Sequence, residues 1–192
     1  MNKAFKSFLE SYKRKNLKYI NTGWTRIHPD SNTYETPATI LKEHRLNEAH
    51  ICFYFGDQLD EILLLKCKCL DYKDSTVYRF GFEKIAKLEE LNDSNGTSIG
   101  FADYHMKTIK FFEPPNQIYS IEPGEEKNQL IEQNYLPNGI LIEFENGKYM
   151  SLYGTEGDDQ HEPTIYFNFI ESDEIEIHKI DSMMKWELEY EI

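Results

Sequence analysis

The sequence is poor in cysteine and has no long hydrophobic run. Its 192 residues include 3 cysteines, an odd and sparse set that makes a poor disulfide framework and predicts reduced thiols. No stretch approaches the roughly 18 apolar residues that a membrane-spanning helix needs. The first twenty residues interleave lysine with phenylalanine and leucine, which does not fit a secretory signal. We therefore expect a cytoplasmic protein that does not act on membranes.

The familiar local signatures of catalysis are also missing. The chain contains no GxSxG, HExxH or phosphate-binding-loop pattern. Cys67 and Cys69 are separated by one residue, and no second cysteine pair follows to complete a zinc site. In a strand both cysteines would share a face with Leu63 and Leu65, so we interpret them as core residues. We expect no cofactor, no metal and no enzymatic activity.

Positive charge is scarce and unevenly placed. The chain has 21 lysines and arginines against 34 aspartates and glutamates, which gives a net charge of −13. The first 18 residues carry six basic side chains and one glutamate, a net +5, so the other 174 residues carry −18. Such a field repels nucleic acid and attracts basic proteins. The sequence therefore predicts a basic protein partner and no binding of nucleic acid.

The clearest structural signal is the segment from residue 139 to residue 154, GILIEFENGKYMSLYG. Asn146 and Gly147 suit a type I′ hairpin turn, because both central residues of that turn need positive φ. A two-residue loop would place Phe144 opposite Tyr149 and Ile142 opposite Ser151. On this register the alternation of strand side chains predicts two faces. The apolar face holds Ile140, Ile142, Phe144, Tyr149 and Tyr153, and the charged face holds Glu143, Glu145 and Lys148.

Four segments are predicted to be helices. Residues 3 to 19 carry apolar side chains at helical spacing among basic ones, which predicts a basic amphipathic helix packed on the protein. Thr36 suits an N-cap and Pro37 the first position of a second helix, in which Ile40, Leu41 and His44 share a face. Shorter helices are expected at residues 83 to 91 and 125 to 135.

The remaining periodic segments are predicted to be strands. Residues 50 to 55 and 61 to 70 read as a hairpin with a five-residue loop. Further strands are expected at residues 77 to 82, 99 to 104, 108 to 112 and 117 to 121, and then around residues 165 to 169, 175 to 177 and 186 to 192. The predicted fold is one α+β domain over residues 1 to 192. It has a mostly antiparallel sheet, helices mainly in the first two thirds, and a β-rich part over residues 139 to 192.

The last two expected strands suggest an acidic binding surface. If residues 181 to 184 form a loop, the two strands place glutamates opposite one another, which destabilises a sheet by about 0.2 to 1 kcal/mol per pair. A basic partner could compensate these charges with lysines and arginines. Alternatively, the face is solvated, or the protein's own basic helix covers it. The candidate partner-binding pairs are His178 with Glu187, Glu176 with Glu189, and Glu174 with Glu191.

A second acidic cluster occupies residues 158 to 162. Carboxylates beside His161 are groups that bind divalent cations or tune a general base. Their spacing matches no metal motif, so a solvated acidic loop is the preferred interpretation. Asp158, Asp159 and Glu162 then add a rim to the partner-binding surface. The alternative function, a small metal-dependent hydrolase, would use the same loop.

An acidic α+β chain with the hairpin ILIEFENGKYMSLY and a glutamate-rich, aromatic sheet resembles the immunity proteins that bacteria make against secreted nucleases or other cytotoxic domains. The resemblance implies that the protein neutralises a basic toxin domain by direct contact, with acidic residues covering the toxin's nucleic-acid surface. A further alternative is an acidic mimic of nucleic acid that binds many basic proteins.

Overall fold

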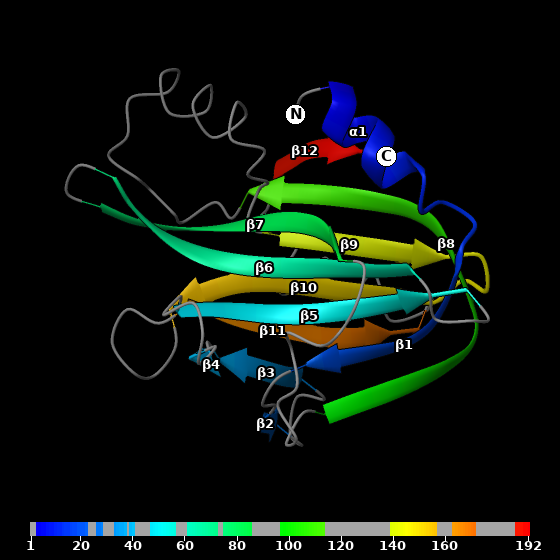
Figure 1. Ribbon diagram of the computed structural model, residues 1–192, viewed down its shortest axis with the longest axis horizontal. Coiled ribbons are helices and arrows are strands. Elements are labelled where there is room, and N and C mark those ends of the chain that lie inside the picture. Colours follow the sequence, from blue (N-terminus) through cyan, green and yellow to red (C-terminus); the bar gives the residue numbers. More distant parts are fainter. Residues whose placement is uncertain are drawn as a thin grey trace.

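The computed structural model describes residues 3–22, 26–28, 33–37, 39–40, 47–56, 61–72, 75–85, 97–113, 139–156, 163–171 and 187–192. Over these residues one short helix precedes a 12-stranded sheet (Figure 1). The elements are α1 (Lys3–Glu10), β1 (Asn16–Thr22), β2 (Arg26–His28), β3 (Thr33–Pro37), β4 (Thr39–Ile40), β5 (Asn47–Phe55), β6 (Glu61–Tyr72), β7 (Ser75–Ile85), β8 (Thr97–Glu113), β9 (Gly139–Phe144), β10 (Tyr149–Glu156), β11 (Pro163–Ile170) and β12 (Glu187–Glu191).

Neighbouring strands are antiparallel and follow the order β2-β3-β11-β10-β9-β8-β1-β5-β6-β7, with β12 beside β8 and β4 beside β5. Strand β8 joins the two halves of the sheet, because its first part pairs with β1 and its second part with β9. Figure 1 shows β8 curving around one side of the molecule. The sheet folds over so that β11 contacts β5 and β6, and β10 contacts β7. The result is two layers that face each other.

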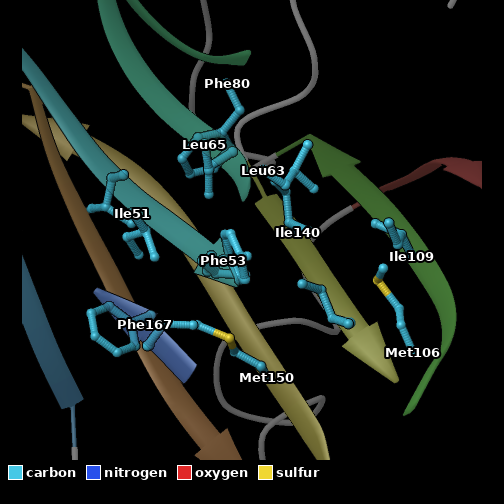
Figure 2. Packing of buried hydrophobic residues seen from close by; sticks show 14 of the residues in the cluster. Ile51, Phe53, Leu63, Leu65, Phe80, Met106, Ile109, Ile140, Met150 and Phe167 are labelled. Carbon is cyan, nitrogen blue, oxygen red and sulfur yellow. The ribbon is translucent and has the colours of Figure 1, made fainter. Parts of the chain in front are cut away.

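The hydrophobic core lies between these layers. Alternate residues of each strand point inward, as the two-residue period of a strand requires. Ile51 and Phe53 of β5 lie in one layer, opposite Met150 of β10 and Phe167 of β11 (Figure 2). Each of these side chains is at most 1% exposed. Burial of this apolar surface is the main force that holds the layers together.

Helix α1 packs on this core at the end of the sheet. Leu9 and the turn residue Tyr12 are buried, and the Tyr12 ring lies 5.1 Å from that of Phe55. The chain turns at Arg14, which has a φ of 65°, and its backbone N–H donates to the carbonyl of Met106 at 2.7 Å. The predicted packing of the basic segment on the protein is confirmed. The predicted helix over residues 3 to 19 is wrong after Glu10, because the chain enters strand β1 at Asn16.

A β-bulge interrupts the two-residue alternation of strand β1. The register of β1 against both of its neighbours shifts between Leu17 and Tyr19. A bulge adds one residue to a strand, so consecutive inward positions become three residues apart. Leu17 and Ile20 are accordingly both buried. Spacing of three is also one turn of a helix, and the sequence alone does not distinguish the two.

The predicted α+β class is wrong, because α1 is the only helix within the described ranges and spans 8 residues. Thr36 and Pro37 end strand β3 instead of opening a helix. Cross-strand packing outweighs the local capping signal there, since the ring of Tyr34 stacks on that of Phe167 at 4.9 Å. Glu83 to Ile85 continue strand β7, and residues 99 to 112 form one strand instead of two.

The hairpin of β9 and β10 is confirmed, but its predicted register is wrong by one residue. Tyr149 lies opposite Glu143, and the backbone N–H of Phe144 donates to the carbonyl of Lys148 at 2.9 Å. The loop therefore has three residues and ends at Gly147, whose φ is 80°. Three-residue hairpin loops commonly place a left-handed residue at this position. Because the observed register differs by one residue from the predicted one, the other face of β10 points inward. Met150 and Leu152 are therefore in the core in place of Tyr149 and Tyr153.

Several other predictions are confirmed. Strands β5 and β6 form the expected hairpin, with Phe55 opposite Glu61. Ile165, Phe167 and Phe169 of β11 all belong to the core or pack against it. The strand expected at residues 77 to 82 is the middle of β7. The helix expected at residues 125 to 135, the strands expected at 117 to 121 and 175 to 177, and Leu41 and His44 of the second predicted helix lie outside the described residues.

Candidate functional site: the charged outer face of β8, β9 and β12

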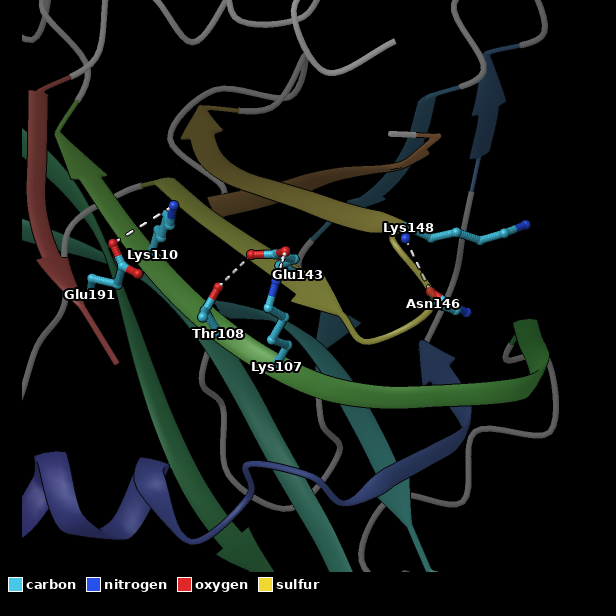
Figure 3. Close-up of polar contacts among 7 residues, drawn as sticks. All are labelled: Lys107, Thr108, Lys110, Glu143, Asn146, Lys148 and Glu191. Atoms are coloured by element: carbon cyan, nitrogen blue, oxygen red, sulfur yellow. Dashed lines mark hydrogen bonds and ion pairs between the residues drawn. The ribbon is translucent and has the colours of Figure 1, made fainter. Parts of the chain in front are cut away.

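The outer face of β8, β9 and β12 carries a group of interacting charged side chains (Figure 3). Ile140 and Ile142 of β9 point into the core. Because side chains alternate along a strand, Leu141 and Glu143 point outward. The register places Thr108 of β8 opposite Glu143 of β9. The same outer face brings together Lys107, Thr108, Lys110, Glu143 and Glu191, which we call the charged face.

Glu143 is the centre of the charged face. Lys107 Nζ donates to Glu143 Oε1 at 2.6 Å, and Thr108 Oγ1 donates to Glu143 Oε2 at 3.1 Å. The Glu143 side chain is 16% exposed, whereas that of Lys107 is 55% exposed. Both carboxylate oxygens therefore have donors, and the glutamate is more enclosed than the lysine that neutralises it.

The surroundings of Glu143 keep its carboxylate ionised. Partial burial on its own would raise the pKa of Glu143, but hydrogen bonds from Lys107 and Thr108 and the charges of Lys107 and Lys110 outweigh it, so the pKa is lowered. The hydrogen bond to Glu143 in turn raises the pKa of Lys107. At neutral pH Glu143 is therefore a fixed negative charge and a hydrogen-bond acceptor.

A second ion pair joins the last strand to the sheet. Lys110 of β8 lies opposite Glu191 of β12, and their charged groups are 3.7 Å apart. The backbone of Ile192 exchanges two hydrogen bonds with that of Ile109, at 2.9 and 3.0 Å. The C-terminal strand is therefore held by backbone pairing, and Lys110 compensates the charge of Glu191.

Polar contacts of Asn146 and Lys148 fix the hairpin tip next to the charged face. Asn146 Oδ1 accepts a hydrogen bond from the backbone N–H of Lys148 at 3.0 Å (Figure 3). Asn146 Nδ2 donates to the carbonyl of Asp103 at 2.9 Å, and Lys148 Nζ pairs with Glu171 at 2.8 Å. The asparagine predicted as a turn residue thus also anchors the tip to β8.

The three candidate glutamates of the last strand have different positions in the register. Glu187 lies opposite Glu113, and Glu191 opposite Lys110. A shift between Leu188 and Tyr190 leaves Glu189 at a bulge. The bulge interrupts the two-residue alternation, so the register does not require Glu187 and Glu191 to share a face, as the predicted acidic surface assumed.

The other candidate partner-binding residues lie outside the part of the chain that the structure describes. They are Glu174, Glu176, His178, Asp158, Asp159 and Glu162, together with His161 of the alternative metal site. Among the residues that are described, no group of three or more His, Cys, Asp and Glu side chains could hold a metal ion. Over the same residues, no helix is long and apolar enough to cross a membrane.

Two cysteines of the sheet, Cys52 and Cys67, have buried side chains. Cys67 is buried in the main core, which confirms its predicted role, and Cys52 is buried on the outer side of β5. Burial raises the pKa of the Cys52 thiol to about 12. Cys52 is therefore a neutral thiol at physiological pH. The side chain of Cys69 is not among those described.

Sequence reasoning missed the lysines that neutralise the charged face. Lys107 and Lys110 lie in β8, and Glu143 and Glu191 follow more than 30 residues later in the chain. Alternation along residues 108 to 112 does indicate that Thr108 and Lys110 point away from the core. The sequence does not indicate which strands lie on either side of β8, and that pairing decides which acids these cations meet.

Comparison of the chain with models of known protein families, with curated proteins and with solved structures found no match.

Proposed function

We propose that this chain is a cytoplasmic, acidic binding protein that acts by direct contact with a basic protein. The charge distribution carries the proposal. The chain has 34 acidic and 21 basic residues, a net charge of −13, and residues 19 to 192 on their own carry −18. This acidic excess favours fast encounter with a basic surface.

The partner proposed here is a toxin domain that binds nucleic acid. Such a domain has a positively charged surface, because it must neutralise phosphates. Acidic side chains placed on that surface would compete with its nucleic-acid substrate. The resemblance to bacterial immunity proteins supports this choice. The candidate contacts in the acidic second half of the chain are Glu174, Glu176, His178, Asp158, Asp159 and Glu162.

The first test is the identity of the bound partner. The tagged chain is purified from its native cells in moderate salt, and the proteins that remain bound are identified by mass spectrometry. We expect one basic protein at about equal stoichiometry. Recovery of many unrelated basic proteins would favour a general nucleic-acid mimic instead, and purification without any basic protein would contradict the proposal.

Charge reversal then locates the contact. We expect Asp158→Lys with Asp159→Lys, and separately Glu174→Lys with Glu176→Lys, to weaken binding of the partner at least about tenfold in calorimetry. The matched control is Glu10→Lys with Glu145→Lys, which makes the same charge change at two exposed positions away from these segments. If the control weakens binding as much as the other pairs do, the contact depends on net charge alone and not on the acidic segments.

A further inference from the structure

A stacked pair of tyrosines lies on the outer face of β1 and β5. The rings of Tyr19 and Tyr54 are 4.0 Å apart and only 17° from parallel. Tyr54 is 1% exposed, and it packs in a small outer cluster with Cys52, Ile62 and Leu64. A buried ring on one side thus fixes the orientation of the Tyr19 ring.

The second face of the Tyr19 ring points toward β8. Strand β1 lies between β5 and the first part of β8, and the register places Tyr19 opposite Tyr54 on one side and opposite Gly100 on the other (Figure 1). Cross-strand neighbours share a face of the sheet. Because the two tyrosine rings stack in the direction from strand to strand, the opposite face of Tyr19 looks over Gly100.

The space above Gly100 is open. A Cβ atom built on Gly100 would have no heavy atom within 4 Å, and the residue is exposed. The Tyr19 ring therefore leans toward Tyr54 and leaves Gly100 uncovered. We call this open space above Gly100, beside the Tyr19 ring, the gap.

Polar groups lie two residues along the strands from this gap. Asn21 of β1 lies opposite Ser98 of β8, and Asn21 Nδ2 donates to Ser98 Oγ at 2.9 Å in an exposed position. This hydrogen bond orients the amide and leaves Asn21 Oδ1 as an acceptor. The gap therefore has one oriented acceptor beside it, Asn21 Oδ1.

We propose that the gap over Gly100 binds an arginine side chain of the basic partner, stacked on Tyr19 and donating to Asn21. The choice of arginine follows from the chemistry. A guanidinium is flat, carries five N–H donors and no acceptor, and stacks on aromatic rings better than a lysine ammonium does. The net charge of −13 attracts basic proteins to the chain as a whole. The identity of the occupant rests on the proposed function, whereas the geometry of the gap does not.

Two short peptides test the site directly. Acetyl-Gly-Arg-Gly-amide and its lysine counterpart carry the same charge, and amide shifts of the full chain are followed by NMR during titration in about 0.15 M salt. We expect the arginine peptide to bind at least about threefold more tightly than the lysine peptide, with the largest shifts around Tyr19 and Gly100.

Two glycine substitutions supply a matched pair. Gly100→Val fills the gap and should abolish the preference for arginine. Gly81→Val is the control, because a Cβ there also meets nothing within 4 Å and neither glycine has a positive φ. Both variants should keep the fold, as circular dichroism would show, and Gly81→Val should keep the preference. Equal binding of the two peptides to the wild-type chain, or a preference that persists in Gly100→Val, would overturn the site.

The results of the partner purification and of the Gly100→Val test together distinguish failure of the arginine site from failure of the proposed function. If a basic partner is found and binds wild type and Gly100→Val equally, the proposed function stands and the arginine site falls. If the arginine preference depends on Gly100 but no basic protein is recovered from cells, the site stands and the proposed function falls.

Discussion

The two faces of the β9–β10 hairpin are built from the same stretch, residues 139 to 156, but depend on different interactions. On the inner face, Ile142, Phe144 and Met150 are at most 3% exposed and belong to the hydrophobic core. On the outer face, Glu143 is held by a lysine and a threonine of β8. Burial therefore fixes the position of the hairpin, and the outer contacts determine which charges the surface presents.

The two faces of the hairpin differ in the kind of contact that their side chains make, and not only in how deeply these side chains are buried. Leu141 and Ile170 also point outward, yet both are buried, with Phe112 and Tyr149 packed against them. Tyr153, farther along β10, is 38% exposed and stacks on Tyr166 at 5.1 Å. The outer face thus combines an apolar patch, an aromatic pair and ion pairs, whereas the inner face is uniformly apolar.

Truncation of one aromatic residue on each face should give the largest difference. Phe144→Ala removes a fully buried ring and should lower the free energy of unfolding by about 3 to 5 kcal/mol, because a cavity remains. Tyr153→Ala, the control on the outer face, should cost about 1 kcal/mol. Urea denaturation measures both values. Similar losses would support the two-residue loop, which puts both rings on the same face, and would contradict the observed register.

Local patterns predicted the turn and the strands of this hairpin but not its register. Asn146 and Gly147 mark the turn whether the loop has two or three residues, and Glu145 can belong to either the strand or the loop. Ile140, Ile142 and Phe144 alternate in both cases. The two loop lengths differ only in which face of β10 points into the core. Both faces of β10 carry large apolar residues, so hydrophobicity alone does not distinguish the two registers.

The error in fold class has a related physical cause. Leu17 and Ile20 are separated as on a helix because a bulge lies between them, and Thr36-Pro37 has the chemistry of a helix start although it ends a strand. In both places the pairing with a distant strand overrides local preference. The partners of the charged face depend on the same distant pairing, which is why Lys107 and Lys110 were not anticipated.

The next test concerns the backbone of the loop. Gly147 has a φ of 80°, where an L-residue with a Cβ is strained, so Gly147→Ala should destabilise the protein by about 1 to 2 kcal/mol. Gly81→Ala is the matched control in a strand with ordinary φ and open space, and it should be neutral or slightly stabilising. Thermal and urea unfolding measure both. An unaffected Gly147→Ala variant would mean that the loop does not require a left-handed residue.

On the outer face, Glu143 should make stability depend on pH. Its pKa is lowered in the folded state, so its contribution is fully present above the pKa of the unfolded chain and is lost as pH falls through the folded value. Glu143→Gln should cost about 1 kcal/mol at pH 7, and the difference from wild type should shrink as the pH falls below about 4.5. Urea denaturation across this range measures the difference. Glu145→Gln, at an exposed position in the loop, is the control; a difference for Glu143→Gln that is constant with pH would mean that its charge is not involved.

The smallest effect is expected at the other ion pair of the charged face. Lys110 and Glu191 are 3.7 Å apart, and their side chains are 33% and 49% exposed. Water and salt screen such a pair, so a double-mutant cycle of Lys110→Met and Glu191→Gln should give a coupling energy of about 0.2 to 0.5 kcal/mol that shrinks in 1 M salt. A coupling above about 1 kcal/mol would mean that side-chain charge, and not the backbone pairing of β12 with β8, holds the last strand in place.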